Sequence, residues 1–352
     1  MAKYPINNIL LFNPYGIGNT ILLIPFLRNL RDHYPDAKIQ MVITQRVVED
    51  LLEGQDLIDI FCHYENSSSP KKNRSFNISN LKRYLSRISK LMVWVKRSAA
   101  DIVFIPEQLT WKTALFILGS RARLSVCQKG DNWFLDKIPS HSVSVRDGVH
   151  EVEWWLDLLR PLENDVRQMR PSLVLSKENK NYWAERYFKM GKGRKIIGIH
   201  PGCSNALHEK RWPVDRYCTL IKALKEKMGF FPIVFGGPDD IDVSDAIMQK
   251  LKIKFMNYTN RLSILDTATA VSQCDLFISN DSGLMHVAAS VGTPIIALFG
   301  DTNVTKNSPL ITDSVVLDGG KMNSGSKLKA IDRITSEDVL AAIKLIQNRK
   351  SA

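Results

Sequence analysis

The feature that most constrains the fold of this chain is a regular alternation of short β-rich runs with amphipathic helical patterns. In the first half, predicted strands at Ile9–Asn13, Ile39–Ile43, Leu57–Cys62 and Ile102–Ile105 alternate with helical patterns near Asn19–His33, Val47–Leu52 and Ser79–Lys96, and a further helical pattern spans His150–Leu159. Alternation of this kind is typical of βαβ units, which place parallel strands in one sheet and helices on its faces. We therefore predict an α/β fold.

The second half repeats the alternation. Helices are predicted at Lys177–Lys189, Val214–Met228, Asp240–Leu251, Ile264–Gln273 and Gly283–Val291, and strands at Lys195–His200, Phe231–Phe235, Leu276–Ser279 and Pro294–Phe299. Because 352 residues exceed one ordinary hydrophobic core, we expect two Rossmann-like domains, residues 1–170 and 171–352, whose parallel sheets face a central cleft. The aperiodic stretch Glu163–Leu175 is the expected linker. A last helix, Ser336–Asn348, follows a capping-box pattern at Thr335 or Ser336.

The composition indicates a cytoplasmic protein without a membrane span. No apolar run approaches the ~20 residues that a transmembrane helix needs, and the N-terminus lacks the pattern of a signal peptide. The five cysteines are dispersed and contain no Cys-x-x-Cys pair, so we expect reduced thiols and no metal or redox centre.

The formal charge of +12 is concentrated in one segment. Nine Lys and Arg residues, and no Asp or Glu, lie between Asn66 and Ala100, in a polar loop (Glu65–Ser75), in the helix Ser79–Lys96 and at Arg97 directly after it. A basic segment of this kind favours an anionic membrane face or a phosphorylated glycolipid. A solvated helix face is the alternative. We expect no nucleic-acid partner.

The first candidate site is the loop Asn13-Pro-Tyr-Gly-Ile-Gly-Asn19 between a strand and its helix. Gly16 and Gly18 permit a tight turn and close backbone approach, and the helix start at Asn19 offers N–H groups to an anion. It is not the dinucleotide fingerprint, because Ile21 stands where that pattern has its third glycine. A plain βα turn is the alternative interpretation.

Two further strand ends carry polar motifs. His200-Pro-Gly-Cys-Ser204 is followed by Glu209-Lys-Arg-Trp-Pro213, in which two cations next to turn amides suit a diphosphate leaving group. Ser279-Asn-Asp-Ser-Gly-Leu-Met-His286 opens a helix whose first N–H groups suit an anion, with Asp281 as a cap or a sugar-hydroxyl acceptor.

With Lys-Arg-Trp-Pro followed about seventy residues later by Asn-Asp-Ser-Gly-Leu-Met-His, the chain resembles glycosyltransferase family 9, the ADP-heptose:lipopolysaccharide heptosyltransferases. Gly-Ile-Gly-Asn19 and Phe-Gly-Gly-Pro-Asp-Asp240 resemble the same family. The resemblance implies a GT-B fold and an inverting enzyme that needs no metal or cofactor. The donor would be a nucleotide sugar, with ADP-heptose the family's usual one, and the acceptor a lipopolysaccharide core or related glycan.

The resemblance also implies a donor site in the second domain and an acceptor site in the first. Lys210 would bind donor phosphate, Asp240 would reach the ribose, and the amides of the Asp-Ser-Gly motif would hold the diphosphate. The implied donor-binding residues are Ser204, Lys210, Asp240, Leu262, Asp281, Ser282, Gly283 and His286.

One position departs from the family pattern. Many members carry Asp after the second glycine of the first loop as the proposed general base, and here Asn19 stands there. An amide does not take up a proton at neutral pH. Either Glu107 serves as the base, with His150 as the second choice, or Asn19 only orients the acceptor, or catalysis is impaired. A catalytically degenerate sugar-nucleotide-binding protein and a GT-B epimerase or hydrolase therefore stay open as alternatives.

Overall fold

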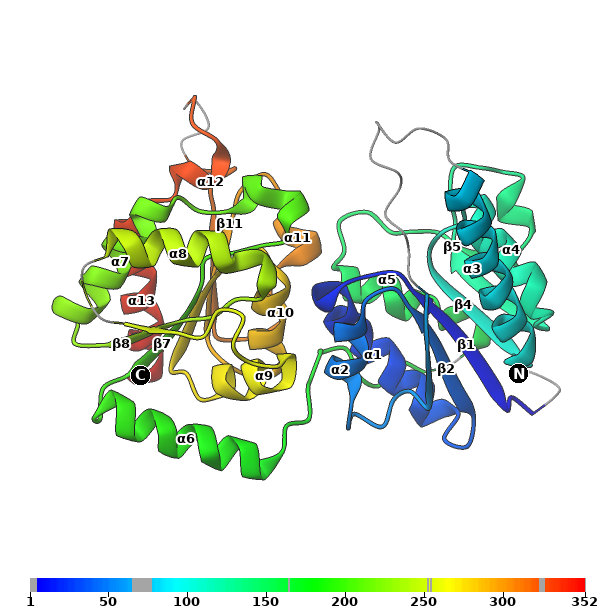
Figure 1. The fold of residues 1–352 in the computed structure, drawn as a ribbon, viewed down its shortest axis with the longest axis horizontal. Coiled ribbons are helices and arrows are strands. Elements are labelled where there is room, and N and C mark those ends of the chain that lie inside the picture. Colours follow the sequence, from blue (N-terminus) through cyan, green and yellow to red (C-terminus); the bar gives the residue numbers. More distant parts are fainter. Residues whose placement is uncertain are drawn as a thin grey trace. The chain divides into compact units, whose positions relative to one another are not determined.

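The computed structural model describes residues 5–64, 78–163, 165–251, 253, 255–322 and 327–351. The chain divides into two compact units, which we describe separately. The first unit comprises Met1–Gly16 and Leu23–Met169, and the second comprises Ile17–Leu22 and Arg170–Ala352. Each unit is built on a parallel sheet of six strands, so the α/β architecture expected from the sequence is confirmed (Figure 1).

The sheet of the first unit has the strand order β3-β2-β1-β4-β5-β6. Its strands are β1 (Asn8–Asn13), β2 (Lys38–Ile43), β3 (Ile60–His63), β4 (Ile102–Gln108), β5 (Leu124–Gln128) and β6 (His141–Val143). Its helices are α1 (Ile17–His33), α2 (Arg46–Leu52), α3 (Ile78–Arg97), α4 (Trp111–Ser120) and α5 (Glu151–Asp157), although the start of α1, Ile17–Leu22, is grouped with the second unit. Leu10, Val42 and Val103 of the sheet pack against Val95 of α3 and Phe116 of α4. Both faces are covered, since α1 and α2 lie opposite α3 and α4 (Figure 1).

Three elements of this unit are missing from the sequence prediction, and one strand is displaced. The strand expected at Leu57–Cys62 begins at Ile60, and α4, β5 and β6 were not predicted. Helix α4 was not predicted because its outward face is apolar like its buried face, so it lacks the amphipathic period that identifies a surface helix. Strand β5 is short and carries Ser125 and Gln128, which weakens its β-rich pattern.

The sheet of the second unit has the order β12-β11-β10-β7-β8-β9. Its strands are β7 (Ile196–His200), β8 (Phe231–Val234), β9 (Met256–Asn257), β10 (Leu276–Asn280), β11 (Ile295–Phe299) and β12 (Ser314–Asp318). The main helices are α6 (Lys177–Gly191), α7 (Val214–Glu226), α8 (Ile241–Lys250), α9 (Ile264–Ser272), α10 (Gly283–Ser290) and α13 (Ser336–Ser351), with the short α11 (Val304–Asn307) and α12 (Ala330–Arg333). The edge strands β9 and β12 were not predicted.

The last helix, α13, belongs to the core of the second unit. Val339, Ile343 and Ile346 are buried in the same apolar cluster as Tyr217 of α7. Thr335 provides the expected capping box, since its Oγ1 accepts a hydrogen bond from the Asp338 N–H (3.1 Å) while the Asp338 carboxylate accepts from the Thr335 N–H (2.8 Å). The helix therefore completes the α7 side of the sheet.

Candidate functional site

The second sheet brings two of the predicted motifs together. From β7 the chain runs outward through β8 and β9 and then returns to the other side of β7 as β10, so β7 and β10 are neighbours, with Ser279 paired to His200. Ligands of open α/β sheets bind at such a switch point, outside the carboxyl ends of the strands. The loop after His200 and the start of α10 at Ser282–Gly283 both lie there.

His200, at the end of β7, connects three polar side chains. Its Nε2 lies 3.1 Å from Asp240 Oδ2, and its Nδ1 lies 2.9 Å from Ser282 Oγ and 3.3 Å from Ser279 Oγ. Beside an ionised Asp240, Nε2 carries the proton and a neutral ring accepts the Ser282 hydroxyl at Nδ1.

Asp240 is buried, and its carboxylate points into the protein. Burial alone would raise the pKa of Asp240, but the hydrogen bond from His200, the charges of His200 and Arg211 and the N–H of Gly237 together hold that pKa below its usual value. Oδ1 of Asp240 is buried and makes no hydrogen bond among the described residues. The carboxylate lies directly over Gly202, where an added Cβ would be only 1.7 Å from Oδ1.

Lys210 and Asp281, both predicted as donor-binding residues, form an ion pair. The Lys210 Nζ donates to Asp281 Oδ2 over 2.7 Å, and the two side chains are 20% and 6% exposed. Lys210 ends the 3₁₀ helix Asn205–Lys210, and Asp281 directly follows β10. An ammonium group has three N–H donors, so this contact leaves two of them for other acceptors.

Asn280 fixes the two loops relative to one another. Its Nδ2 donates to the carbonyl oxygens of Pro201 (2.9 Å) and Gly202 (3.1 Å), and its Oδ1 accepts from Tyr217 Oη (2.8 Å) and the Trp212 N–H (3.3 Å). Asn280 is fully buried. Since four hydrogen bonds meet on one amide, the side chain holds the β7 loop against the β10 loop.

The amino end of α10 completes this group. Ser282 is the N-cap of the helix, in extended conformation, and makes no side-chain cap bond because its hydroxyl faces His200. The first-turn N–H groups of a helix have no intrahelical acceptor, and the helix dipole favours negative charge there. Lys210, which is paired with Asp281, thus lies together with the first-turn N–H groups of α10 at the switch point.

The other predicted donor residues also belong to the second unit. Ser204 is exposed at the start of the 3₁₀ helix, and Leu262 is half-buried, two residues before α9. His286 is buried within α10.

The first sheet has its switch point at β1 and β4, where the first predicted loop and Glu107 lie. Tyr15, in the loop after β1, donates through Oη to the carbonyl oxygen of Pro106 over 3.0 Å. Burial raises the pKa of Glu107 above its ordinary value. The pKa of Tyr15 is also raised, by burial and by the charges of Glu107 and Glu151. Glu107 is therefore a carboxyl group shifted toward the pKa range that suits a general base.

His150, the second choice for the base, is engaged in the fold. Its Nδ1 accepts a hydrogen bond from the Val152 N–H (3.2 Å), which makes it the N-cap of α5, and the residue is buried. An imidazole that uses this lone pair as a helix cap is a poorer proton acceptor than Glu107.

The glycine loop starts a helix earlier than predicted. Gly16 is the N-cap of α1, so Ile17, Gly18 and Asn19 form its first turn, and Asn19 is half-buried. The first turn contains no acidic side chain, so no carboxylate of that turn competes with a bound anion for its backbone N–H groups.

Comparison with known proteins decides the family. Residues 88–335 match glycosyltransferase family 9 (heptosyltransferase). The chain belongs to this family.

Relatives match over most of its length. Lipopolysaccharide heptosyltransferase 3 of Escherichia coli strain K12 is 25% identical over 341 residues, which cover 92% of this chain and 94% of that protein. Lipooligosaccharide heptosyltransferase 2 of Campylobacter jejuni is 25% identical over 301 residues, 84% of this chain and 82% of its own. The solved structure of E. coli ADP-heptose lps heptosyltransferase II superposes with a TM-score of 0.77 at 20% identity, covering 98% and 100% of the two chains. That likeness confirms the GT-B fold.

This family 9 glycosyltransferase contains site residues that the sequence prediction passed over. Asn280 and His200 stand inside the quoted motifs but were given no role. Residues of a buried strand are usually apolar, so a polar residue at the carboxyl end of such a strand indicates a role in the site. Among the described residues, no three His, Cys, Asp or Glu side chains cluster as metal ligands do. A search of the same residues finds no helix with the length and hydropathy of a membrane span.

Proposed function

We propose that this glycosyltransferase transfers heptose from ADP-heptose to a lipopolysaccharide core or related glycan, by an inverting reaction that requires no divalent ion. The observation that carries the proposal is the cationic group at the second switch point, where Lys210 lies beside the amino end of α10. The names of the family 9 relatives supply the sugar and the acceptor class.

The donor's diphosphate binds between Lys210 and α10. The two remaining N–H donors of Lys210 and the backbone N–H groups of Ser282 and Gly283 contact its oxygens. This positive potential stabilises the charge that develops on the departing ADP, which is the task a divalent ion performs in other enzymes. Full activity in EDTA supports this mechanism, and activity that depends on added magnesium or manganese contradicts it.

The remaining donor contacts are assigned by the family resemblance. Ser204, Leu262 and His286 line the nucleotide or sugar, and Asp281 orients both Lys210 and a sugar hydroxyl. For Asp240 the resemblance gives a ribose contact. That contact requires its buried Oδ1 to become accessible.

The acceptor binds at the loop after β1, near Gly16, Gly18 and Asn19. Glu107 takes the proton from the acceptor hydroxyl, whose oxygen attacks the anomeric carbon as the bond from that carbon to the diphosphate breaks. ADP leaves with the bonding electron pair, and the configuration at the anomeric carbon inverts. The raised pKa of Glu107 supports its role as the base. Asn19 orients the acceptor.

Asn19 favours one second candidate, a sugar-nucleotide-binding protein without turnover. By the family resemblance, many members carry an Asp as the general base where this chain has Asn19, and an amide does not accept a proton in its place.

A transfer assay separates the candidates. Purified protein is incubated with ADP-heptose and a lipopolysaccharide core acceptor lacking the terminal heptose, and acceptor mass and free ADP are measured. A transferase gives one heptose per ADP released. Release of ADP without gain of acceptor mass indicates a hydrolase, and binding of ADP-heptose with neither product indicates a binding protein. Either of these results overturns the proposal.

A further inference from the structure

Helix α4 presents apolar side chains to solvent. Trp111, Leu115 and Leu118 are 57%, 45% and 60% exposed, and their spacing places them on one face of the helix. The opposite face, with Ala114, Phe116 and Ile117, is buried in the core of the first unit. A helix that is apolar on both faces, one of them exposed, leaves a surface that a water-soluble monomer rarely shows.

Two more exposed aromatic side chains lie in a segment that leaves the sheet at the same edge as α4. Trp133 and Phe134, in the connection between β5 and β6, are 71% and 63% exposed. Strands β4 and β5 are parallel neighbours with Gln108 paired to Gln128, so the segments that follow them leave the sheet at the same edge. Leu135 packs against the same core cluster as the buried face of α4. We call the five side chains Trp111, Leu115, Leu118, Trp133 and Phe134 the aromatic surface.

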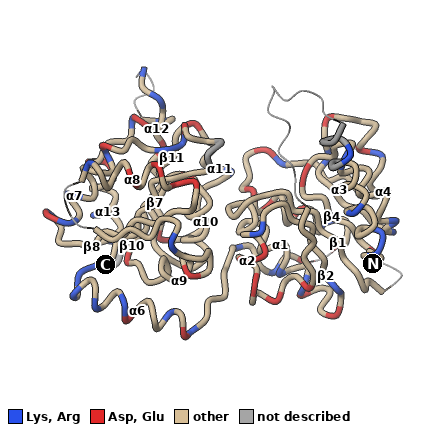
Figure 2. The backbone as a smooth tube through the Cα atoms, viewed as in Figure 1, with Lys and Arg blue, Asp and Glu red and all other residues tan. Residues whose placement is uncertain are grey.

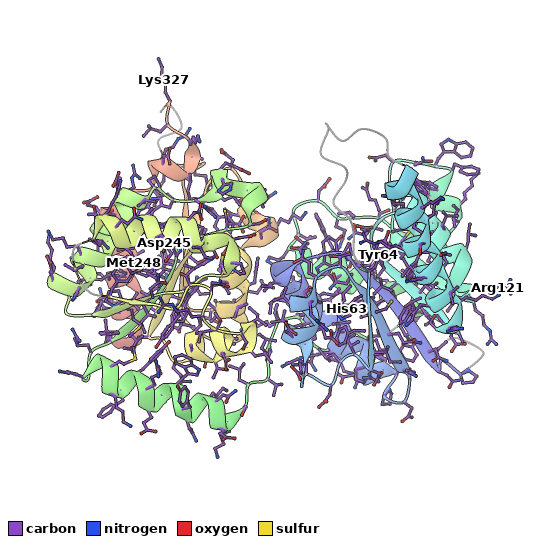
Figure 3. The ribbon with its side chains drawn as sticks, viewed as in Figure 1. His63, Tyr64, Arg121, Asp245, Met248 and Lys327 are labelled. Atoms are coloured by element: carbon purple, nitrogen blue, oxygen red, sulfur yellow. The ribbon has the colours of Figure 1, made fainter. Side chains whose placement is uncertain are left out.

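Cations surround the aromatic surface. Lys112 lies over the ring of Trp111 (5.7 Å to the centroid) and Lys137 over that of Trp133 (4.6 Å). Arg121 and Arg123 follow α4, and Arg121 is exposed at the end of that helix (Figure 3). Between residues 78 and 137 the sequence has eleven Lys and Arg, against four acidic residues: Asp101, Glu107, Asp131 and Asp136.

Helix α3 extends the positive charge next to α4. The two helices pack closely, because a Cβ at Gly119 would lie 2.0 Å from Met92 Cε. Lys82, Lys90 and Lys96 of α3 are exposed, and blue Lys and Arg positions lie along the backbone near α3 and α4 in Figure 2. The expected basic helix is therefore present, whereas the loop predicted before it lies outside the described residues.

We propose that the aromatic surface inserts into the interfacial layer of an anionic lipid bilayer, with the surrounding Lys and Arg contacting the headgroups. Leu and aromatic side chains bordered by Lys and Arg are the composition of interfacial membrane-binding segments, and Trp and Tyr rings accumulate at the headgroup level. An excess of positive charge fits an anionic bilayer better than a second copy of this equally basic chain.

The location of the surface adds a reason for this contact. Glu107 is at the end of β4, four residues before Trp111, so the aromatic surface adjoins the carboxyl edge of the sheet where the first switch point lies. Docking here brings that edge to the headgroups, where a lipid-borne acceptor carries its sugars. This last step rests on the proposed function, whereas bilayer binding itself does not.

Vesicle co-sedimentation tests the proposal. The full chain is mixed with vesicles of phosphatidylcholine, alone or with phosphatidylglycerol, and compared with Trp133→Ser/Phe134→Ser and Leu115→Ser/Leu118→Ser. Phe188→Ser is the matched control, because Phe188 is 75% exposed on α6 of the other unit. We expect the wild type and Phe188→Ser to bind the anionic vesicles, and each double variant to bind at least tenfold more weakly.

Two further measurements keep the result interpretable. Brominated lipids should quench the fluorescence of the wild type more than that of Trp133→Phe, and the melting temperatures of all variants should stay close to that of the wild type, which shows that they are folded. Equal vesicle binding by the wild type and both double variants overturns the proposal. So does a wild-type oligomer that the double variants convert to a monomer, since the surface would then be a protein interface. If the wild type binds the vesicles but transfers heptose to no acceptor, the proposed function is contradicted and the proposed membrane contact is not.

Discussion

Replacement of Lys210 by methionine tests the donor site in most detail. Methionine keeps much of the apolar volume of the lysine stem and removes the ammonium group, which lies 2.7 Å from Asp281 Oδ2. Losing a charge-assisted hydrogen bond to the diphosphate costs about 1.5–3 kcal/mol. At 1.4 kcal/mol per tenfold change, ADP affinity should fall by about 10- to 150-fold.

The same substitution should also destabilise the fold, because Asp281 is 6% exposed and loses its cation. Breaking a fully buried pair costs about 3–5 kcal/mol, and the 20% exposure of Lys210 lowers our expectation to about 1–3 kcal/mol. The unpaired carboxylate then repels the diphosphate. Lys210→Met/Asp281→Asn should therefore bind ADP more tightly than Lys210→Met alone.

Titration calorimetry with ADP and denaturant unfolding measure the two effects. Lys250→Met is the matched control, since Lys250 pairs with Asp215 over 2.6 Å at an exposed position of the same unit. It should leave ADP affinity unchanged. Wild-type ADP affinity in a cooperatively folded Lys210→Met protein would refute the assignment of Lys210 to the diphosphate.

Two further sets of substitutions test the two switch points. Gly202→Ala should lower both the melting temperature and the ADP affinity, because the added Cβ displaces the Asp240 carboxylate. Gly237→Ala is the control: its Cβ would lie 3.9 Å from Asp240 Oδ2, so the melting temperature should stay unchanged. Glu107→Gln should lower kcat by about 10²–10⁴ without changing donor affinity, and full activity in this variant would exclude Glu107 as the base. Because a base acts when it is ionised, the wild-type rate should fall as the pH drops through the raised pKa of Glu107. If Glu107 is the base, Asn19→Asp should raise kcat only slightly.

The sequence was sufficient for the elements that carry strong periodicity. β1, β7 and α10 lie within one residue of the predicted bounds, because each is a buried apolar run bounded by a turn. Helix α4 was not predicted because its exposed face is apolar too. The short edge strands β9 and β12 were not predicted because few of their residues are fully buried, so their apolar pattern is weak.

The candidate site was predictable as motifs but not as a network. Strand ends rich in Ser, Asp and His indicate a switch-point site. The pairing of Lys210 with Asp281, and of His200 with Asp240 and Ser282, joins residues that are 40 to 82 positions apart. Only the strand order brings such residues into contact, and no periodic pattern records which side chains meet.

A crystal structure of the protein with bound ADP tests the central claim most directly. The account predicts the diphosphate outside the carboxyl ends of β7 and β10, with phosphate oxygens within hydrogen-bond distance of Lys210 Nζ and of the Ser282 or Gly283 backbone N–H. ADP bound elsewhere on the chain, or at this switch point with its phosphates away from both Lys210 and α10, would contradict it.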